Sequence, residues 1–273
     1  ATLVDSPADL AGVDVLCTMV STGKDVEALY FGERGVLTGD KTPGIFIDFS
    51  SIGVDHSAQL REQLSARGAQ FLCSPVSGNG KCVKAGKLSS VVSGPQEVYD
   101  TVKYIIEAIA VNGVSYVGDG ELARFCKIAH NVMLGVVTQN LAEITVLAEK
   151  AGVSRYAFLD FMNNSVMGSI FTRYKTNAFV NLDWTTTFTP ALLRKDLDLG
   201  LAAGRELNVA MPVTAATREA LQAHFGAASL QGDPEAYLEK DFAAMIETVG
   251  LASGLTLESE DKPYATGLEV PGA

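Results

Sequence analysis

The chain has 273 residues, enough for one large domain or two smaller ones, and its 47% hydrophobic content allows a substantial core. Its net charge of −11 argues against nucleic-acid binding and against docking on anionic lipid. The four cysteines lack C-x-x-C spacing and three of them sit in apolar runs, so we expect reduced core cysteines and a cytoplasmic protein. The three histidines lie far apart, so we expect no metal site. No apolar run reaches about 18 residues, which predicts no membrane span.

The first 118 residues alternate between short apolar runs and helical patterns. Strands are predicted at 13–20, 44–51, 70–76 and 89–94, and helices at 24–30, 55–68 and 95–110. This alternation predicts an α/β layer with parallel strands, in which ligands bind beyond the carboxyl ends of the strands. The loops after Val20, Ser51 and Val76 are therefore the expected edge of a site.

From about residue 119 the pattern becomes helical. A proline-free stretch runs to Lys150 and is apolar on nearly every face in its middle, which predicts one long, buried helix. Further helices are predicted at 154–164, 190–207, 212–226 and 233–249, three of them with a proline in the first turn. We expect a sheet domain over 1–118, an all-α domain over 119–252 on the long connecting helix, and a polar tail over 253–273, either loose or laid on a partner subunit.

The segment Gly118–Ala123 matches the pattern G-x-G-x-x-A after a strand-like run. A dinucleotide fingerprint needs a second strand with an acidic residue about 20 positions further on, whereas this segment is followed by helix through Lys150. We therefore interpret the two glycines as a tight strand-to-helix turn. No other G-x-G-x-x-G occurs in the chain, so the sheet domain is either small or incomplete at its N-terminal end.

Lys127 lies in the most apolar part of the long helix, and Asn131 follows one turn later on the same face. Two interpretations are open. The lysine extends its head group to water, or it is a general acid beside an asparagine that orients a substrate oxygen.

Three other segments are equally ambiguous from their residues alone. The stretch SPVSGNG at 74–80 is an ordinary turn or a loop that grips a small anion with N–H groups and a hydroxyl. Lys195 and Asp196 form a solvated pair or part of a site. The serines that end DFSS at 48–51 cap the next helix or lie at the site edge.

In order and spacing, these pieces resemble the β-hydroxyacid dehydrogenase family over residues 3–251. The resemblance rests on SPADL at 6–10, DFSS at 48–51, PVSG at 75–78, GDG at 118–120 with Lys127 and Asn131 downstream, RKDLDLGL at 194–201 and MPVT at 211–214. It implies a Rossmann-type domain, a helical domain and NAD or NADP as the cofactor. It also implies an NAD(P)-dependent 3-hydroxyacid dehydrogenase or reductase that acts on a small carboxylate substrate. The G-x-G-x-x-G segment with which the family begins is missing from this chain.

The resemblance also assigns residues. The family's catalytic lysine falls on Lys127 and its partner asparagine on Asn131. The loop that binds the substrate carboxylate falls on Ser77 and Gly78, followed by Asn79 where the family has glycine. The remaining positions are His130, Phe188 and Asp196 on the substrate side, and Val20, Ser21, Ser51 and Lys195 on the cofactor side.

Several of these positions depart from the family pattern. Val20 and Ser21 replace a Leu-Pro pair, and Ser51 replaces a threonine. His130 resembles the K-x-x-H-N of 6-phosphogluconate dehydrogenase, but Leu134 replaces the glutamate of that enzyme type, so its decarboxylation is not expected. We interpret His130 as a substrate contact or second-layer polar group, or as simple packing.

The alternative function is a non-catalytic dinucleotide-binding or scaffold protein derived from this family, which the departures and the missing segment favour. The retained lysine, asparagine and serine favour the enzyme. We also expect a homodimer or homotetramer formed through the helical half, because its helices carry more apolar side chains than one central helix can cover. These are Phe158, Leu159, Phe161, Met162, Leu192, Leu193, Leu197, Leu199 and Leu201.

Overall fold

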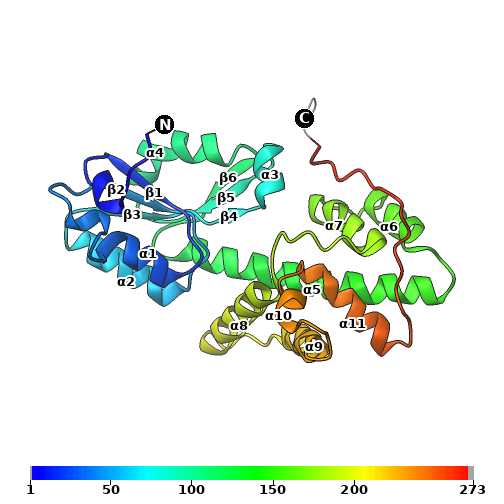
Figure 1. The fold of residues 1–273 in the computed structure, drawn as a ribbon. Helices are drawn as coiled ribbons and strands as arrows, with labels where there is room; N and C mark the ends of the chain where they lie inside the picture. The colour runs from blue at the N-terminus through cyan, green and yellow to red at the C-terminus, as the bar shows by residue number, and fades with distance from the viewer. Residues whose placement is uncertain (1, 270–273) are drawn as a thin grey trace. The chain divides into compact units, whose positions relative to one another are not determined.

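The structure is a computed structural model that describes residues 2–269, and the chain divides into two units, Ala1–Lys127 and Ile128–Ala273 (Figure 1). The first unit holds all the strands of the described chain, and the second is helical. This confirms the predicted Rossmann-type sheet unit followed by an all-α unit on a long helix. The boundary between the units falls inside that helix, and the predicted domain bounds remain a prediction.

Two short sheets form the centre of the first unit. One is parallel with the order β1-β2-β3, and the other has the order β4-β5-β6; a single bridge between Cys73 and Ser93 lies between them. The strands are β1 Val15–Thr18, β2 Ile45–Asp48, β3 Gln70–Cys73, β4 Val76–Ser77, β5 Ser89–Val92 and β6 Gly113–Tyr116.

One expectation about this sheet is wrong. The strand alternation predicts parallel pairing, and the run 70–76 predicts one strand, but β4 is a separate strand that pairs antiparallel with β5. Residues 78–88 connect the two and are too few for the crossover that parallel strands need. The chain therefore turns back as a folded loop directly after Ser77.

Alternation along the strands places helices on both faces of the sheet. Phe46 and Phe71 point into a core with α1 and α2, whereas Ile47 and Leu72 point into a core with α4. All four side chains are almost fully buried, and each such burial is worth roughly 1.5–3 kcal/mol. The helices are α1 Gly23–Phe31, α2 Val54–Ser65, α3 Gly80–Lys84 and α4 Gln96–Ile109, with short 3-10 turns at Pro7–Leu10 and Val36–Thr38.

The second unit is built on α5, Leu122–Lys150, which begins in the first unit. The other helices are α6 Arg155–Asn164, α7 Ile170–Asn181, α8 Pro190–Glu206, α9 Pro212–Ala228, α10 Pro234–Leu238, a 3-10 turn at Phe242–Ala244 and α11 Met245–Ala252. Pro190, Pro212 and Pro234 each begin a helix, as predicted, and the side chains of Thr189 and Asp233 cap two of them.

The predicted helix at 233–249 is wrong, because Asp241 breaks it. The Asp241 carboxylate accepts hydrogen bonds from the N–H of Ala243 and from Lys175 and Thr187. It therefore starts a new helical turn at that point. The helix α7 is not predicted at all, since its sequence IFTRYKTNAFVN mixes apolar with Asn, Thr and charged residues.

The predicted tail at 253–273 is not loose over residues 258–268, which bind their own chain, and a partner subunit on it stays a prediction. The Arg155 guanidinium donates to the carbonyl oxygen of Glu258, and the side chain of Asn177 pairs with the backbone of Tyr264 at 2.8 and 2.9 Å. Leu268 is buried. The described part of the tail is thus an integral layer of the helical unit.

The apolar side chains from which an oligomer is expected are also partly covered. Leu159, Leu193 and Leu197 are buried in cores of the helical unit, whereas Phe161 remains 67% exposed. Of the four cysteines, Cys73 and Cys82 are buried, whereas Cys17 and Cys126 are exposed. The homodimer or homotetramer stays a prediction, which light scattering would test against the monomer mass of 28.8 kDa.

Among the described residues, only α5 has the length and composition of a possible membrane span, with a mean hydropathy of 1.2 in its best window. Half of that window is buried inside the protein, and core helices pass the same test. The helix is therefore weak evidence for a membrane, and the expected absence of a span stays a prediction.

Close packing of α8 on α5 gives the first testable prediction. A Cβ atom added at Gly200 would lie 2.2 Å from Cγ2 of Val132, a β-branched side chain with little freedom to move. We expect Gly200→Ala to lower the free energy of unfolding by about 1–3 kcal/mol in urea titrations, despite the better helix propensity of alanine. The matched control is Gly226→Ala in α9, where the added atom meets nothing within 4 Å. Equal stability of the two variants would contradict the close packing.

Candidate functional site

The two strand ends expected at the cofactor side are joined by hydrogen bonds. Val20 follows β1 and its N–H donates to Ser50 Oγ at 2.9 Å, while Ser50 Oγ donates to Asp48 Oδ1 at 2.7 Å. Thr18 Oγ1 also donates to Asp48 Oδ1, at 2.9 Å. Ser51 follows this buried set and is itself half-buried. The structure thus brings the loops of Val20 and Ser51 together at one sheet edge, as the parallel strands predict.

A buried arginine, which the sequence analysis missed, holds this edge. Arg124 is 1% exposed, and its Nη2 lies 2.6 Å from Asp48 Oδ2. Its Nη1 donates to the carbonyl oxygen of Ser50 at 2.5 Å, and its Nε donates to Ser57 Oγ at 3.0 Å. Burial alone would lower the pKa of Arg124, but the Cys73 thiol, Asp48 and Glu121 raise it above its usual value. The sequence feature that could have indicated Arg124 is a charged residue in the first turn of an apolar helix.

Arg124 lies one turn before Lys127 on α5, so the same guanidinium fixes that turn against the sheet edge. The preceding glycine turn is fixed as well. Gly118 and Gly120 have φ angles of 114° and 62°, and the Gly120 carbonyl accepts from Arg61 Nη2 and Ser93 Oγ, both at 2.7 Å. This confirms a strand-to-helix turn at the G-x-G-x-x-A pattern.

The Arg124–Asp48 pair gives a stability prediction. Arg124→Met leaves the Asp48 carboxylate, which is fully buried, without its cation, so we expect unfolding free energy to fall by about 3–5 kcal/mol. The control is Arg67→Met, which removes an exposed arginine whose Nη1 donates to the Gln63 carbonyl and whose guanidinium lies over Phe31, and should cost less than about 1 kcal/mol. Urea unfolding of both variants compares them. Similar losses would show that the buried pair anchors nothing.

The expected carboxylate loop lies at the end of β4. Gly78 has a φ of 129°, and a Cβ there would lie 2.8 Å from Cys82 Cβ and 3.0 Å from Leu88 Cδ1, so glycine is required. Asn79 Oδ1 accepts from the N–H groups of Lys81 at 2.9 Å and Cys82 at 3.2 Å and thereby caps α3. Its oxygen is therefore committed to the loop, and only its amide N–H groups are available to a substrate. Ser77 is half-buried.

Four of the predicted residues form one polar cluster in the helical unit. Asn131 is 6% exposed, its Nδ2 donates to Asp196 Oδ2 at 2.6 Å, and its Oδ1 lies 2.9 Å from His130 Nδ1. Lys195 Nζ lies 3.4 Å from the other oxygen of Asp196. Asn131 and Asp196 are buried, whereas His130 is exposed and Lys195 is half-buried. Buried polar groups are costly unless they are paired, and here Asn131 and Asp196 pair with each other. The arrangement fixes the side chain of Asn131.

Phe188 lies against an apolar core of the helical unit. It packs edge to face on Phe242 with ring centroids 5.8 Å apart, against the core that contains Leu193 and Leu221. The described contacts of Phe188 are apolar and aromatic, and its place on the substrate side stays a prediction. Lys127 is the last residue of the first unit and is half-buried on α5.

A hollow of about 820 Å³ lies beside the end of β1, where the cofactor is expected. Its lining residues show which parts of a dinucleotide would fit there. Val20 and Ser21 line it, together with Pro7, Met19, Asp25, Ala28, Leu29, Gly32, Glu33 and Arg34. Its volume lies in the range of ligand pockets, and its walls suit the apolar and sugar parts of a cofactor. The N-terminus of α1 is occupied by its own capping box, because Thr22 Oγ1 accepts from Asp25 N–H and Asp25 accepts from Thr22. The hollow therefore fits the sugar side of NAD(P) better than its pyrophosphate.

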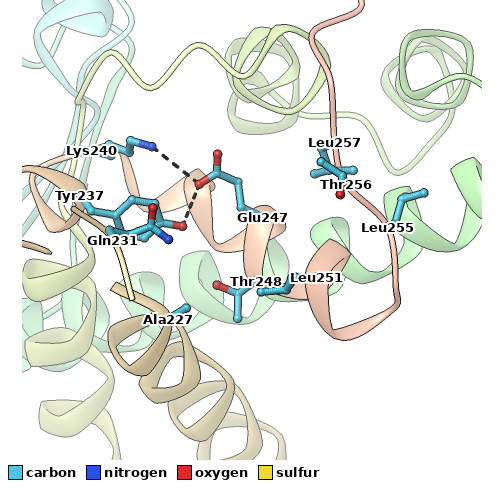
Figure 2. A pocket seen from close by; sticks show the side chains of 10 residues that line it. All are labelled: Ala227, Gln231, Tyr237, Lys240, Glu247, Thr248, Leu251, Leu255, Thr256 and Leu257. Atoms are coloured by element: carbon cyan, nitrogen blue, oxygen red, sulfur yellow. Dashed lines mark hydrogen bonds and ion pairs between the residues drawn. The ribbon is translucent and has the colours of Figure 1, made fainter. Parts of the chain in front are cut away.

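A second pocket, of about 240 Å³, lies among α9, α10, α11 and residues 255–257 and contains none of the predicted site residues. Figure 2 shows Tyr237 and Lys240 directed toward the Glu247 carboxylate, at 2.7 and 3.7 Å. Next to it, His224 is fully buried, with Nδ1 2.9 Å from Thr248 Oγ1 and Nε2 without a hydrogen-bond partner among the described residues. Burial and the nearby Lys240 lower the pKa of His224 to about 4.

This shift predicts a pH dependence of stability. The unfolded imidazole takes up a proton below its usual pKa of about 6.5, whereas the folded one stays neutral down to about 4. Stability contributed by the neutral histidine is therefore full above about 6.5 and falls as the pH drops to about 4, by roughly 3 kcal/mol in total. We expect His224→Phe to lose less stability than the wild type between neutral and mildly acidic buffer in urea titrations. An unchanged pH slope would contradict the assignment.

Comparison with known proteins covers nearly the whole chain. Residues 1–118 match the family described as the NAD-binding domain of 6-phosphogluconate dehydrogenase, and residues 121–249 match the family described as NAD-binding of NADP-dependent 3-hydroxyisobutyrate dehydrogenase. The chain is 29% identical to 2-(hydroxymethyl)glutarate dehydrogenase of Eubacterium barkeri, over 75% of this chain and 68% of that protein. It is 28% identical to 3-hydroxyisobutyrate dehydrogenase of Pseudomonas aeruginosa, over 78% and 74%.

Two further proteins are similar to this chain, one in sequence and one in fold. The human cytokine-like nuclear factor N-PAC is 28% identical over 80% of this chain, which spans only 40% of that protein. The solved structure of 3-hydroxyisobutyrate dehydrogenase from Salmonella typhimurium superimposes with a TM-score of 0.76 over 89% of this chain and 82% of that one, at 24% identity. The last likeness concerns the fold alone.

Proposed function

Because the chain belongs to the β-hydroxyacid dehydrogenase family and carries its NAD-binding domains, we propose that it transfers a hydride between NAD or NADP and a small β-hydroxy acid or the matching semialdehyde. Lys127 is the proposed general acid and base, and the cytoplasm is the proposed location. The observation that carries the proposal is the paired polar cluster of His130, Asn131, Lys195 and Asp196. Asn131 and Asp196 of this set are buried, and a scaffold has no need to bury a polar pair between helices.

The nicotinamide, when bound, supplies or accepts the hydride. The chain's own residues hold the substrate and move the proton. In our proposal, the Ser77 hydroxyl and the N–H groups of the Gly78 loop bind the substrate carboxylate. Lys127 donates a proton to the substrate oxygen as charge develops on it during reduction, and accepts that proton during oxidation. Asn131, with its side chain held by Asp196 and His130, orients the same oxygen.

The remaining assigned residues act on the cofactor side or position Asn131. Val20 and Ser21 line the hollow beside β1, and Ser51 follows the adjacent strand end, so we assign them to the cofactor. Lys195 is assigned to the nicotinamide side and Asp196 to the positioning of Asn131. The named relatives act on hydroxy acids with one carboxylate or with two, which leaves the substrate of this chain to be determined.

A second candidate is a dinucleotide-binding protein without catalysis. It is favoured by the similarity to N-PAC, a protein named as a nuclear factor. The two candidates differ in turnover and agree in cofactor binding, so they are separated by measuring both on the same preparation.

Substitution of Lys127 tests the enzyme proposal. We expect Lys127→Ala to lower kcat by about 10²–10⁴-fold, because general acid–base catalysis is lost, while the Kd of the reduced cofactor stays within about twofold. The measurement is reduced-nicotinamide absorbance with hydroxy acid and semialdehyde substrates, together with cofactor fluorescence titration. The matched control is Lys103→Ala, an exposed lysine in α4 paired with Asp100.

Full activity of Lys127→Ala would rule out the lysine as the acid. A wild-type protein that binds the reduced cofactor but turns over none of the substrates would favour the non-catalytic alternative.

A further inference from the structure

The segment after the carboxylate loop is positively charged, whereas the chain as a whole is acidic. The protein has 32 acidic residues and a net charge of −11, yet no Asp or Glu occurs between Glu62 and Glu97. Inside that acid-free span, Lys81, Lys84 and Lys87 follow Ser77 and Gly78 within a few residues. A local positive region on an acidic protein attracts anions to that place.

The three lysines stand on a folded loop. Ser77 of β4 pairs with Ser89 of β5, and the N–H of Lys87 donates to the Cys82 carbonyl at 2.8 Å. Cys82 and Leu88 are both buried beneath Gly78. The backbone that carries the lysines is thus fixed next to the loop proposed to bind the substrate carboxylate.

The lysine head groups are available. All three residues are exposed, and Lys81 and Lys84 are three positions apart on α3 and share one face. Among residues 2–269 none of the three pairs with a carboxylate, in contrast to Lys103, Lys175 and Lys240. A solvated surface run is the ordinary interpretation of exposed lysines, but here they form a positive region on an acidic chain and lie beside the loop proposed to bind the substrate.

We propose that Lys81, Lys84 and Lys87 bind a second anionic group of the substrate, so that the preferred substrate is a dianion. It carries one carboxylate for the Ser77–Gly78 loop, a second one for the lysines, and the hydroxymethyl or aldehyde group that reacts. This inference rests on the proposed function and narrows its substrate class to dicarboxylates. The same positive charge could instead meet a phosphate of the cofactor, and the experiment below separates the two sources.

The test uses three probes that share the same reacting group. They are 3-hydroxyisobutyrate, 2-(hydroxymethyl)glutarate, and the monoamide of the latter in which the side-arm carboxylate is replaced. The monoamide matches the dicarboxylate in size and lacks only the charge. We expect the wild type to favour the dicarboxylate over the monoamide by about tenfold or more, both in kcat/KM and in the Kd from calorimetry. High salt should reduce this ratio.

The variant Lys81→Gln/Lys84→Gln should lose most of that ratio and leave the KM of NAD and NADP unchanged. The matched control, Lys41→Gln/Lys103→Gln, removes two lysine charges from the same unit and should keep the ratio. Equal use of dicarboxylate and monoamide by the wild type would overturn the inference, as would an unchanged ratio in the first variant. An effect on NADP alone would overturn it too, because the lysines would then face the cofactor.

Failure of the proposed function gives a different result. If no probe is turned over but calorimetry still shows the lysine-dependent preference for the dicarboxylate, the enzyme proposal fails and the dianion site stands. If turnover occurs without that preference, the enzyme proposal stands and the dianion site fails.

Discussion

The buried ion pair between Arg124 and Asp48 is the constraint on which the sheet unit depends. One carboxylate accepts from the guanidinium of α5, from Thr18 at the end of β1 and from Ser50 after β2. A charge in that position is stable only while every partner stays in place. The ion pair therefore holds the strand ends, the loops that follow them and the first turn of the long helix in one arrangement. This arrangement positions the residues proposed for the cofactor and for proton transfer.

In the helical unit, a different set of paired polar side chains fixes the arrangement. The side-chain oxygen of Asn131 contacts His130 Nδ1, and its side-chain nitrogen donates to Asp196. These two contacts leave little freedom for the amide to rotate. Lys175 and Asp241 form a second buried pair and place the break between α10 and α11. In both units, polar groups rather than apolar packing select one particular arrangement from those that the helices would allow.

The sequence predicts those parts of the fold that follow from periodicity. Phe46 and Ile47 alternate between two cores, and Pro190 begins a helix, because these features depend on neighbours in the chain. The antiparallel β4 and the break at Asp241 depend on distant partners, so local patterns miss them. The site is similar: the motifs indicate Asn131 and Asp196, whereas Arg124 and the role of Asn79 as a cap become evident only when the contacts are known.

The contacts of the C-terminal segment have a consequence for the order in which the two units can complete their folding during synthesis. Arg155 and Asn177 lie at the beginning and end of the α6–α7 pair, and their partners Glu258 and Tyr264 follow about a hundred residues later. During synthesis, these two helices emerge from the ribosome well before the segment that pairs with Arg155 and Asn177. The sheet unit can complete its contacts early, since they lie within residues 1–127, but the helical unit has to wait for nearly the whole described chain.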